Sequence, residues 1–256
     1  MKALLVGETW ISSANHYKGF DYFNSSTFHK GYLDFQKSFD DEDVSFEFIG
    51  GHEAAEKFPS TIEELQKFDV IILSDIGANT LLLPPEVWLY SKPVPNRLKL
   101  IERWTREGGG LFMAGGYLSF QGIDGRARWR NTAVERCLPV TCLPYDDRLE
   151  VPEGFTPTAV AEGRDHAILK NLPQNWPLLL GANEVVLRDG ADCLLRLPED
   201  EGGHPLLAAW SYGKGRSAVW TSDIGPHWLP NTFIQWEGYA PLWRNILSWL
   251  GEAKTK

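Results

Sequence analysis

The segment from Asp69 to Leu73 constrains the fold more than any other part of this 256-residue chain. It reads DVIIL, so β-branched and other apolar residues follow one another without a polar residue between them. A strand with one face in water alternates apolar and polar side chains, whereas a strand of a parallel sheet is covered on both faces and reads as a continuous apolar run. The segment therefore predicts a central strand of a parallel sheet, followed by the polar loop SDIGANT.

Other segments fit the same sheet. Strands are predicted at 2–6, 44–49 and 111–114, and apolar residues at helical spacing predict a helix between Pro95 and Glu107. Their order predicts an α/β fold of the flavodoxin-like kind, a doubly wound, mostly parallel sheet with right-handed crossovers. Ligands bind outside the carboxyl ends of the strands in such sheets, which here are the loops after residues 7, 73 and 114.

The segment between the first two strands is expected to contain no further strand. Its polar and aromatic part, from Glu8 to Phe23, is interpreted as a long loop. Ser25 or Ser26 can then cap a helix that runs to about Phe39, and the acidic run 40–43 is interpreted as a solvated connector.

The second half of the chain is predicted to be less regular. Residues 138–200 are rich in proline and acidic groups, which indicates a small β-rich insertion. Two alternating segments, 205–212 and 216–223, flank a glycine-containing turn typical of a hairpin. A final amphipathic helix begins near Pro241 and ends at Gly251. No linker divides the chain, so residues 1–256 are expected to form a single domain.

Charge and composition exclude several classes of protein. The formal net charge is −9 and the sequence pI about 5.2, so neither nucleic acid nor a membrane is expected as a partner. The absence of a signal-peptide core and of a long apolar stretch predicts a cytoplasmic protein. Three cysteines without CxxC spacing, and histidines without HxxxH or HExxH spacing, predict no disulfide, no metal site and no cofactor. Cys142 lies in a predicted loop, where it could be reactive.

Four segments carry a family resemblance: GGGLFMAGGYLSFQG from Gly108, DHAILKNLP from Asp165, HPLLAAWSYGKGRSAVWTSDIGPHW from His204 and PLWRNILSWLG from Pro241. They resemble the class I glutamine amidotransferase superfamily, in particular a bacterial amidotransferase-like group and its ThuA-like relatives. The resemblance implies a flavodoxin-like domain with a nucleophile elbow after the fourth strand. It also implies a cysteine on that elbow, and a histidine and an acidic residue after a late strand.

The elbow departs from this pattern at the nucleophile. Residues 114–119 read Ala-Gly-Gly-Tyr-Leu-Ser and include no cysteine. Glutamine hydrolysis in this superfamily needs a thiolate to form a thioester, so glutaminase activity is not expected. The late strand does lead to His227, four residues after Asp223, although the usual His-Pro-Glu motif is absent.

Three residues are catalytic candidates. Ser119 offers a hydroxyl near the elbow, and His227 with Asp223 could act as its base and orienting group. In the alternative interpretation Ser119 caps a turn and His227 packs beside Trp228. Sequence alone leaves both open, because a triad is defined by geometry.

A further set of residues is expected to bind a ligand. Glu8 and Asp75, with Asp223, follow three different strands, so their carboxyl groups can converge on one cleft, or each can cap a turn instead. The backbone of the glycine turn can hold an anion, as can the guanidinium of Arg126, which could equally form an exposed ion pair. The other ligand-binding candidates are Trp10, Asn79, Gly115, Gly116, Tyr117 and Trp228.

Eleven tryptophans are many for a chain of this length. Trp10, Trp129, Trp228 and Trp236 fall in predicted loops, where large aromatic rings can stack on ligands or anchor subunit interfaces. We expect at least half of them to make contacts in a homo-oligomer.

Three functions are consistent with these features. The first is an amidotransferase-like protein without glutaminase activity that binds an unknown small molecule. The second is a hydrolase of unknown substrate, with carbohydrate-related compounds as one candidate class, that uses Ser119 or a water activated by His227 and Asp223. The third is a non-catalytic protein that assembles as a homo-oligomer.

Overall fold

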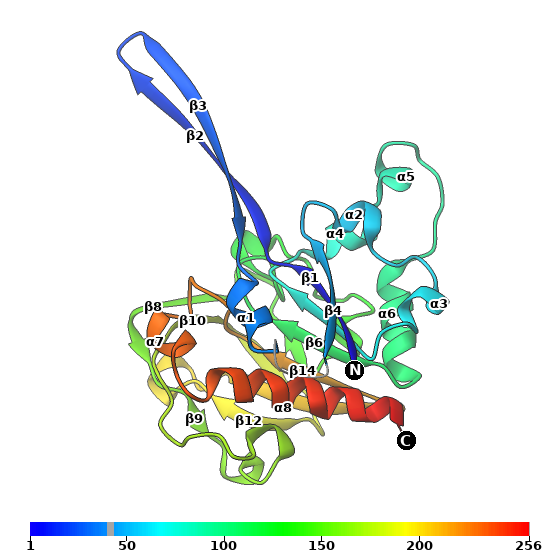
Figure 1. The fold of residues 1–256 in the computed structure, drawn as a ribbon, viewed down its shortest axis with the longest axis vertical. Coiled ribbons are helices and arrows are strands. Elements are labelled where there is room, and N and C mark those ends of the chain that lie inside the picture. The colour runs from blue at the N-terminus through cyan, green and yellow to red at the C-terminus, as the bar shows by residue number, and fades with distance from the viewer. Residues whose placement is uncertain (40–43, 256) are drawn as a thin grey trace.

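An eight-stranded sheet forms the centre of the protein (Figure 1), in a computed structural model that describes residues 1–39 and 44–255. The strand order is β4-β1-β5-β6-β14-β13-β12-β9. The first five strands run parallel to one another: β4 (Ser45–Gly50), β1 (Lys2–Gly7), β5 (Val70–Ser74), β6 (Gly110–Ala114) and β14 (Gly215–Trp220). Three more extend the sheet with antiparallel pairing: β13 (Pro205–Tyr212), β12 (Asp192–Arg196) and β9 (Thr158–Ala159). The protein is therefore mixed α/β with a large, mostly parallel sheet, consistent with a flavodoxin-like fold.

The central strand β5 has helices on both sides. Its side chains alternate between two apolar clusters, with Val70 and Ile72 in one and Ile71 and Leu73 in the other. The first cluster includes residues of α1 (Leu33–Lys37) and α8 (Tyr239–Gly251). The second includes residues of α2 (Ala54–Lys57), α3 (Ile62–Leu65), α4 (Ala78–Leu82) and α6 (Arg97–Arg106). All five residues of β5 are buried, as the apolar run predicts.

Two helices agree closely with their predictions from sequence. The predicted helix between Pro95 and Glu107 is α6, whose first turn is capped by Asn96 through a 3.1 Å hydrogen bond from the Lys99 N–H. The C-terminal helix begins at Tyr239, two residues before Pro241. Two short helices, α5 (Pro85–Trp88) and α7 (Asn231–Ile234), complete the set of α-helices in the described residues. None of the helices in 1–39 and 44–255 is both long and apolar enough to cross a membrane.

Residues 138–200 contain the short strands that their composition predicts. Two small antiparallel pairs lie there, formed by β7 (Val140–Cys142) with β11 (Val185–Leu187) and by β8 (Arg148–Phe155) with β10 (Leu179–Asn183). Within the same range, β9 and β12 join the edge of the central sheet, so part of this segment extends the main sheet.

The segment after β1 differs from its prediction. In place of a loop and a long helix, β2 (Thr9–Lys18) and β3 (Asp21–Lys30) form an antiparallel hairpin that projects from the body (Figure 1), and only the short α1 is helical. Nearly every residue of both strands is exposed. A strand without a buried face lacks the apolar alternation by which strands are recognised, which explains the error. The predicted acidic connector, 40–43, lies outside the described residues.

Candidate functional site

A cavity of about 410 Å³ lies where β1, β5, β6 and β14 end. Each of these strands leads directly into a segment that lines it, as expected for ligand sites in open α/β sheets. The lining residues are Glu8, Trp10, Asp75, Tyr117, Leu118, Ile123, Arg126, Asp223, Gly225, Pro226 and His227. The structure thus brings the Asp223–His227 pair together with Glu8 and Asp75, from which it lies far away in the sequence.

Two of these acidic residues have an unusual backbone conformation. Glu8 and Asp75 have φ values of +54° and +44°, in the left-handed region that non-glycine residues rarely adopt. Such residues typically cost about 1–3 kcal/mol each and cluster at functional sites. The surrounding hydrogen bonds hold both in place: the Ser74 hydroxyl donates to Glu8 Oε1 (2.5 Å) and the Leu118 N–H donates to Asp75 Oδ1 (2.8 Å).

Gly116 allows the carboxyl groups to come together beneath the elbow. It has a φ of +126°, and a Cβ atom there would lie 2.9 Å from Asp75 Oδ1 and 3.0 Å from Asp223 Oδ1. Real Cβ atoms essentially never make a contact under 3.0 Å, and one of 3.0 Å is unusually tight, so a side chain at this position would displace a carboxylate or the turn. Acidic groups of the protein itself therefore occupy the space where a side chain of residue 116 would stand.

The N–H groups of the glycine turn are largely used inside the protein. Gly115 donates to the carbonyl oxygens of Trp220 (2.8 Å) and Ser222 (2.9 Å), and Gly116 donates to Asn183 Oδ1 (3.0 Å). We expected Gly115 and Gly116 to offer their backbone to an anion. The donors of both residues are instead satisfied by protein acceptors.

Burial and mutual repulsion perturb the carboxyl groups of the cavity. Burial, together with the charges of Asp75 and Asp223, raises the pKa of Glu8 to about 8 against an opposing hydrogen bond from Ser74. Burial and the charge of Asp223 likewise raise the pKa of Asp75 to about 6. Near neutral pH Glu8 therefore carries a proton, which it can donate.

Asp223 and His227 form a hydrogen-bonded pair at the rim of the cavity. His227 Nδ1 lies 2.8 Å from Asp223 Oδ2, which also accepts the N–H of Trp228 (2.9 Å). Burial alone would lower the pKa of His227, but the hydrogen bond and charge of Asp223 outweigh it and raise that pKa. The imidazole also packs edge to face against Tyr117, with ring centroids 4.5 Å apart. An oriented imidazole of this kind can accept or donate a proton near neutral pH.

Ser119 lies outside the lining of the cavity. It is buried, and its Oγ accepts the N–H of Asp75 at 3.2 Å. This contact matches the alternative interpretation in which Ser119 supports a turn. It helps to hold the backbone of Asp75 in its left-handed conformation.

The other predicted ligand residues differ in how close they lie to the cavity. Trp10 and Arg126 line it, and Arg126 also forms an ion pair with Asp124 (3.4 Å). Asn79 is exposed on α4 and does not line it. Trp228 is only 1% exposed, and its Nε1 donates to Glu150 Oε2 (2.9 Å).

The structure buries two of the four tryptophans that fall in predicted loops, and the expected homo-oligomer stays a prediction. Trp228 and Trp129 are buried within the chain, and the Trp129 indole donates to the Ile76 carbonyl (2.9 Å). Buried rings have no surface to offer a second chain. Trp236 packs partly buried against the core, while Trp10 is 43% exposed.

Two residues that sequence reasoning missed hold the elbow in place. Asn183 contacts both the N–H and the carbonyl of Gly116, and its Nδ2 donates to Asp147 Oδ1 (2.9 Å). Asp147 in turn accepts the N–H groups of Gln121 (2.7 Å) and Gly122 (2.8 Å), and burial raises its pKa to about 6. Neither residue belongs to a recognisable motif, so no sequence signal identifies them.

Burial makes the thiols of the three cysteines unreactive. All three are buried, and none lines the cavity. Cys142 lies in β7, where the prediction had a loop, and burial raises its pKa well above the usual range. Burial also raises the pKa of Cys137 to about 12. In addition, the described residues contain no cluster of three or more His, Cys, Asp or Glu side chains suited to a metal ion.

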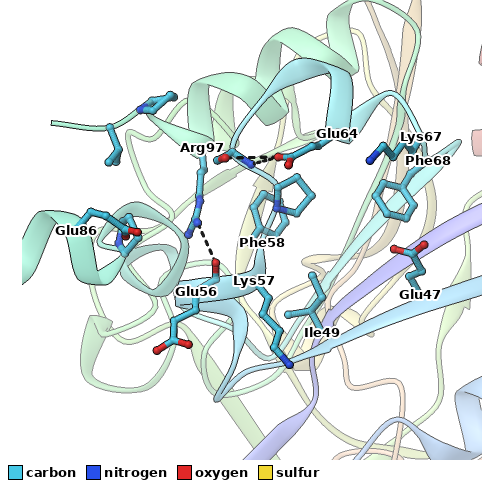
Figure 2. Close-up of a pocket in the computed structure, with 15 residues that line it drawn as sticks. Glu47, Ile49, Glu56, Lys57, Phe58, Glu64, Lys67, Phe68, Glu86 and Arg97 are labelled. Atoms are coloured by element: carbon cyan, nitrogen blue, oxygen red, sulfur yellow. Dashed lines mark hydrogen bonds between the residues drawn. The ribbon is translucent and has the colours of Figure 1, made fainter. Parts of the chain in front are cut away.

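A second hollow, also of about 410 Å³, lies beside α2, α3 and β4 (Figure 2). Two of its charged residues, Arg97 and Glu64, already serve the local structure. The Arg97 guanidinium donates to the carbonyl of Ala55 (2.7 Å), and the Glu64 carboxylate accepts the N–H groups of Ser60 (2.7 Å) and Thr61 (3.2 Å) to cap α3. The acid-lined cavity at the strand ends is therefore the better candidate site.

The fold and the cavity define an α/β protein with an acid-lined cleft at the carboxyl ends of its parallel strands. The chain belongs to the GATase1_like family, described as putative glutamine amidotransferase, whose model matches residues 2–252.

Solved structures include proteins similar over the whole chain. The cytoplasmic protein STM3548 from Salmonella typhimurium is 38% identical, with a TM-score of 0.92 over 98% of this chain and 99% of that one. The cytoplasmic protein STM1381 from Salmonella typhimurium LT2 is 37% identical, with a TM-score of 0.91 over the same shares of both chains. A ThuA-like protein from Bacteroides uniformis shares the fold at 13% identity, with a TM-score of 0.56 over 97% of this chain and 90% of that one. No curated protein matches the chain.

Proposed function

We propose that this protein is a cytoplasmic, amidotransferase-like protein that binds a small molecule in its acidic cleft and does not hydrolyse glutamine. The cytoplasmic assignment rests on the two Salmonella relatives described as cytoplasmic. The binding site rests on the doubly wound arrangement inferred from the sequence, in which ligands lie outside the carboxyl ends of the strands.

The proposed absence of glutaminase activity rests on one observation. Gly116 is the elbow residue with a positive φ, the strained position from which a nucleophile would project. It has no side chain, and Asp75 and Asp223 occupy the space where one would stand. A thioester needs a thiolate at this point, and the buried cysteines lie elsewhere.

The chemistry of the cavity narrows the class of ligand. The carboxylates of Asp75 and Asp223 would repel an anion, so carboxylates and phosphates are disfavoured. A protonated Glu8 and two carboxylates suit hydroxyl and amine groups, while Trp10 and Tyr117 offer flat apolar faces. A neutral polyhydroxylated compound or an amine fits this combination best.

Two assays test the proposal. Incubation with glutamine is expected to release no glutamate above the level of a protein-free control. A thermal-shift screen of neutral sugars, amines, carboxylates and nucleotides is expected to give hits in the first two classes only. Asp75→Asn should remove these shifts, whereas Glu63→Gln, an exposed position on α3, should not. Glutaminase turnover, or binding confined to carboxylates or nucleotides, would refute the proposal.

The Asp223–His227 pair favours a second candidate function, hydrolysis of a bond in the bound molecule. His227 would take a proton from an attacking water, and the protonated Glu8 would give a proton to the leaving group. Ser119 is the weaker nucleophile because its hydroxyl is buried and bound to the Asp75 N–H. With chromogenic glycosides and esters as substrates, His227→Ala should abolish turnover and Ser119→Ala should retain it. Loss of turnover in a folded Ser119→Ala variant would reverse these roles.

A further inference from the structure

The imidazole of His227 is held by little besides packing. Within residues 1–39 and 44–255 it makes one hydrogen bond, between Nδ1 and Asp223 Oδ2 (2.8 Å), and its side chain is 41% exposed. A ring that is bound at one atom can still tilt and rotate about that bond. The neighbouring side chains must therefore fix the orientation of the imidazole if it is to act on a molecule in the cavity.

Two aromatic rings flank this imidazole. Trp228 stacks on it with ring centroids 5.1 Å apart and an interplanar angle of 29°, and Tyr117 meets it nearly at right angles, at 4.5 Å and 84°. Tyr117 and Trp228 also contact each other, with centroids 5.8 Å apart. These separations are typical of packed aromatic pairs. The three rings thus form one cluster, in which Tyr117 and Trp228 limit the rotation of the imidazole.

A single carboxylate binds both flanking rings. The Tyr117 hydroxyl donates to Glu150 Oε1 (3.0 Å), and the Trp228 indole N–H donates to Glu150 Oε2 (2.9 Å). Hydrogen bonds to an ionised acceptor are stronger than those between neutral groups. Each oxygen of Glu150 holds one ring, so the carboxylate links the two rings that enclose the imidazole.

The strand that carries Glu150 holds Tyr117 at a second point. Arg148 and Glu150 are two positions apart on β8, and alternate residues of a strand point to the same face. The guanidinium of Arg148 lies over the Tyr117 ring, 5.0 Å from its centroid, and donates to the carboxylate of Asp146 at 2.9 and 2.8 Å. Tyr117 is therefore fixed both at its hydroxyl and at the face of its ring.

The neighbouring strand β10 positions Trp228. Gly181 of β10 pairs with Glu150 of β8, and a Cβ atom at Gly181 would lie 2.4 Å from two atoms of the Trp228 ring. The missing side chain of Gly181 lets the indole lie against β10, within reach of Glu150. The Leu180 N–H also donates to the carbonyl of Trp228 (2.8 Å). The β8–β10 pair, which lies within residues 138–200, therefore supports the His227 side of the cavity.

We propose that Glu150 is a positioning residue for His227: its carboxylate links Tyr117 to Trp228, and these two rings fix the orientation of the imidazole at the rim of the cavity. The arrangement exists in the free protein and does not depend on a ligand. Its importance for chemistry rests on the proposed function, in which His227 acts on a molecule bound in the cavity.

NMR of the histidine ring protons tests this assignment without any ligand. Nearby aromatic rings displace these signals from their positions in an unfolded chain, and His227→Ala identifies the signals of His227 among those of the six histidines. Glu150→Ala removes both hydrogen bonds, so the His227 signals should lose most of this displacement. Glu150→Gln should retain it, because the amide can accept the Trp228 N–H and donate to the Tyr117 oxygen.

A matched control and a second variant complete the test. Glu153→Ala removes an exposed carboxylate from the same strand and should leave the His227 signals at their wild-type positions. Wild-type signals in a folded Glu150→Ala variant, or equal losses in Glu150→Ala and Glu150→Gln, would overturn the assignment. Should Glu150→Ala fail to fold, Tyr117→Phe keeps the ring but loses its bond to Glu150, and it should move the His227 signals in the same direction; unchanged signals would overturn the assignment as well.

The two proposals can fail independently. A thermal-shift screen without hits would refute the proposed function and leave the positions of the His227 signals unaffected. Conversely, unchanged signals in Glu150→Ala would remove the role of Glu150 and leave the binding of a ligand intact.

Discussion

Replacement of Glu8 by glutamine should make the protein more stable at neutral pH. Glu8 is 6% exposed, and its pKa rises from 4.5 to about 8 on folding. Below pH 4.5 the carboxyl group is protonated in both the folded and the unfolded chain. Between pH 4.5 and 8 the unfolded chain loses the proton while the folded chain keeps it, so the free energy of unfolding falls as pH rises.

The size of the effect follows from this shift. At 1.36 kcal/mol per pKa unit, the loss reaches roughly 3 kcal/mol at pH 7 and 4–5 kcal/mol above pH 8. Glutamine is nearly isosteric with protonated glutamate, and its carbonyl can still accept the Ser74 hydroxyl that Glu8 accepts. Glu8→Gln should therefore equal the wild type near pH 4.5 and exceed it by about 3 kcal/mol at pH 7. For a chain of this size, this corresponds to a melting temperature roughly 6 °C or more higher.

Urea unfolding followed by tryptophan fluorescence at pH 4.5, 7 and 8.5 measures this difference. The exposed Glu63→Gln serves as the matched control and should follow the wild type at every pH. If the wild type and Glu8→Gln keep a constant difference across this range, Glu8 does not carry a raised pKa in the folded protein. The case for a proton donor in the cavity would then fail.

Three further predictions concern the elbow, the Asp223–His227 pair and the thiols. Asn183→Ala leaves the buried Gly116 N–H without its partner and removes one of three hydrogen bonds to Asp147, so it should lower the free energy of unfolding by about 2–4 kcal/mol. A loss under about 1 kcal/mol in urea unfolding would contradict the role of Asn183. Asp223→Asn removes the carboxylate that raises the pKa of His227, so an NMR titration should show that pKa falling, and an unchanged pKa would place its cause elsewhere. A thiol reagent should modify none of the three buried cysteines until urea unfolds the chain, whereas rapid modification of the native protein would show an accessible thiol.

The central sheet could be predicted from sequence because its environment is encoded in its composition. A strand covered on both faces must be apolar throughout, and the segment at Val70–Ser74 meets that condition without help from the rest of the chain. The helix at Arg97–Arg106 is similarly marked by its period and its cap. The grouping of Glu8, Asp75 and Asp223 also follows from sequence, because parallel strands end on the same edge of a sheet.

Only the tertiary structure shows the contacts between residues that lie far apart in the sequence. Asn183 reaches Gly116 across 67 positions, and Ser119 meets the Asp75 N–H across 44, distances over which no local pattern operates. The β2–β3 hairpin escaped prediction for the opposite reason, since both of its faces are exposed and leave no period in the sequence. The periodicity of apolar residues in a sequence reflects which residues the folded protein buries. A solvent-exposed ribbon and a hydrogen bond between polar groups far apart in the sequence both produce no such periodicity.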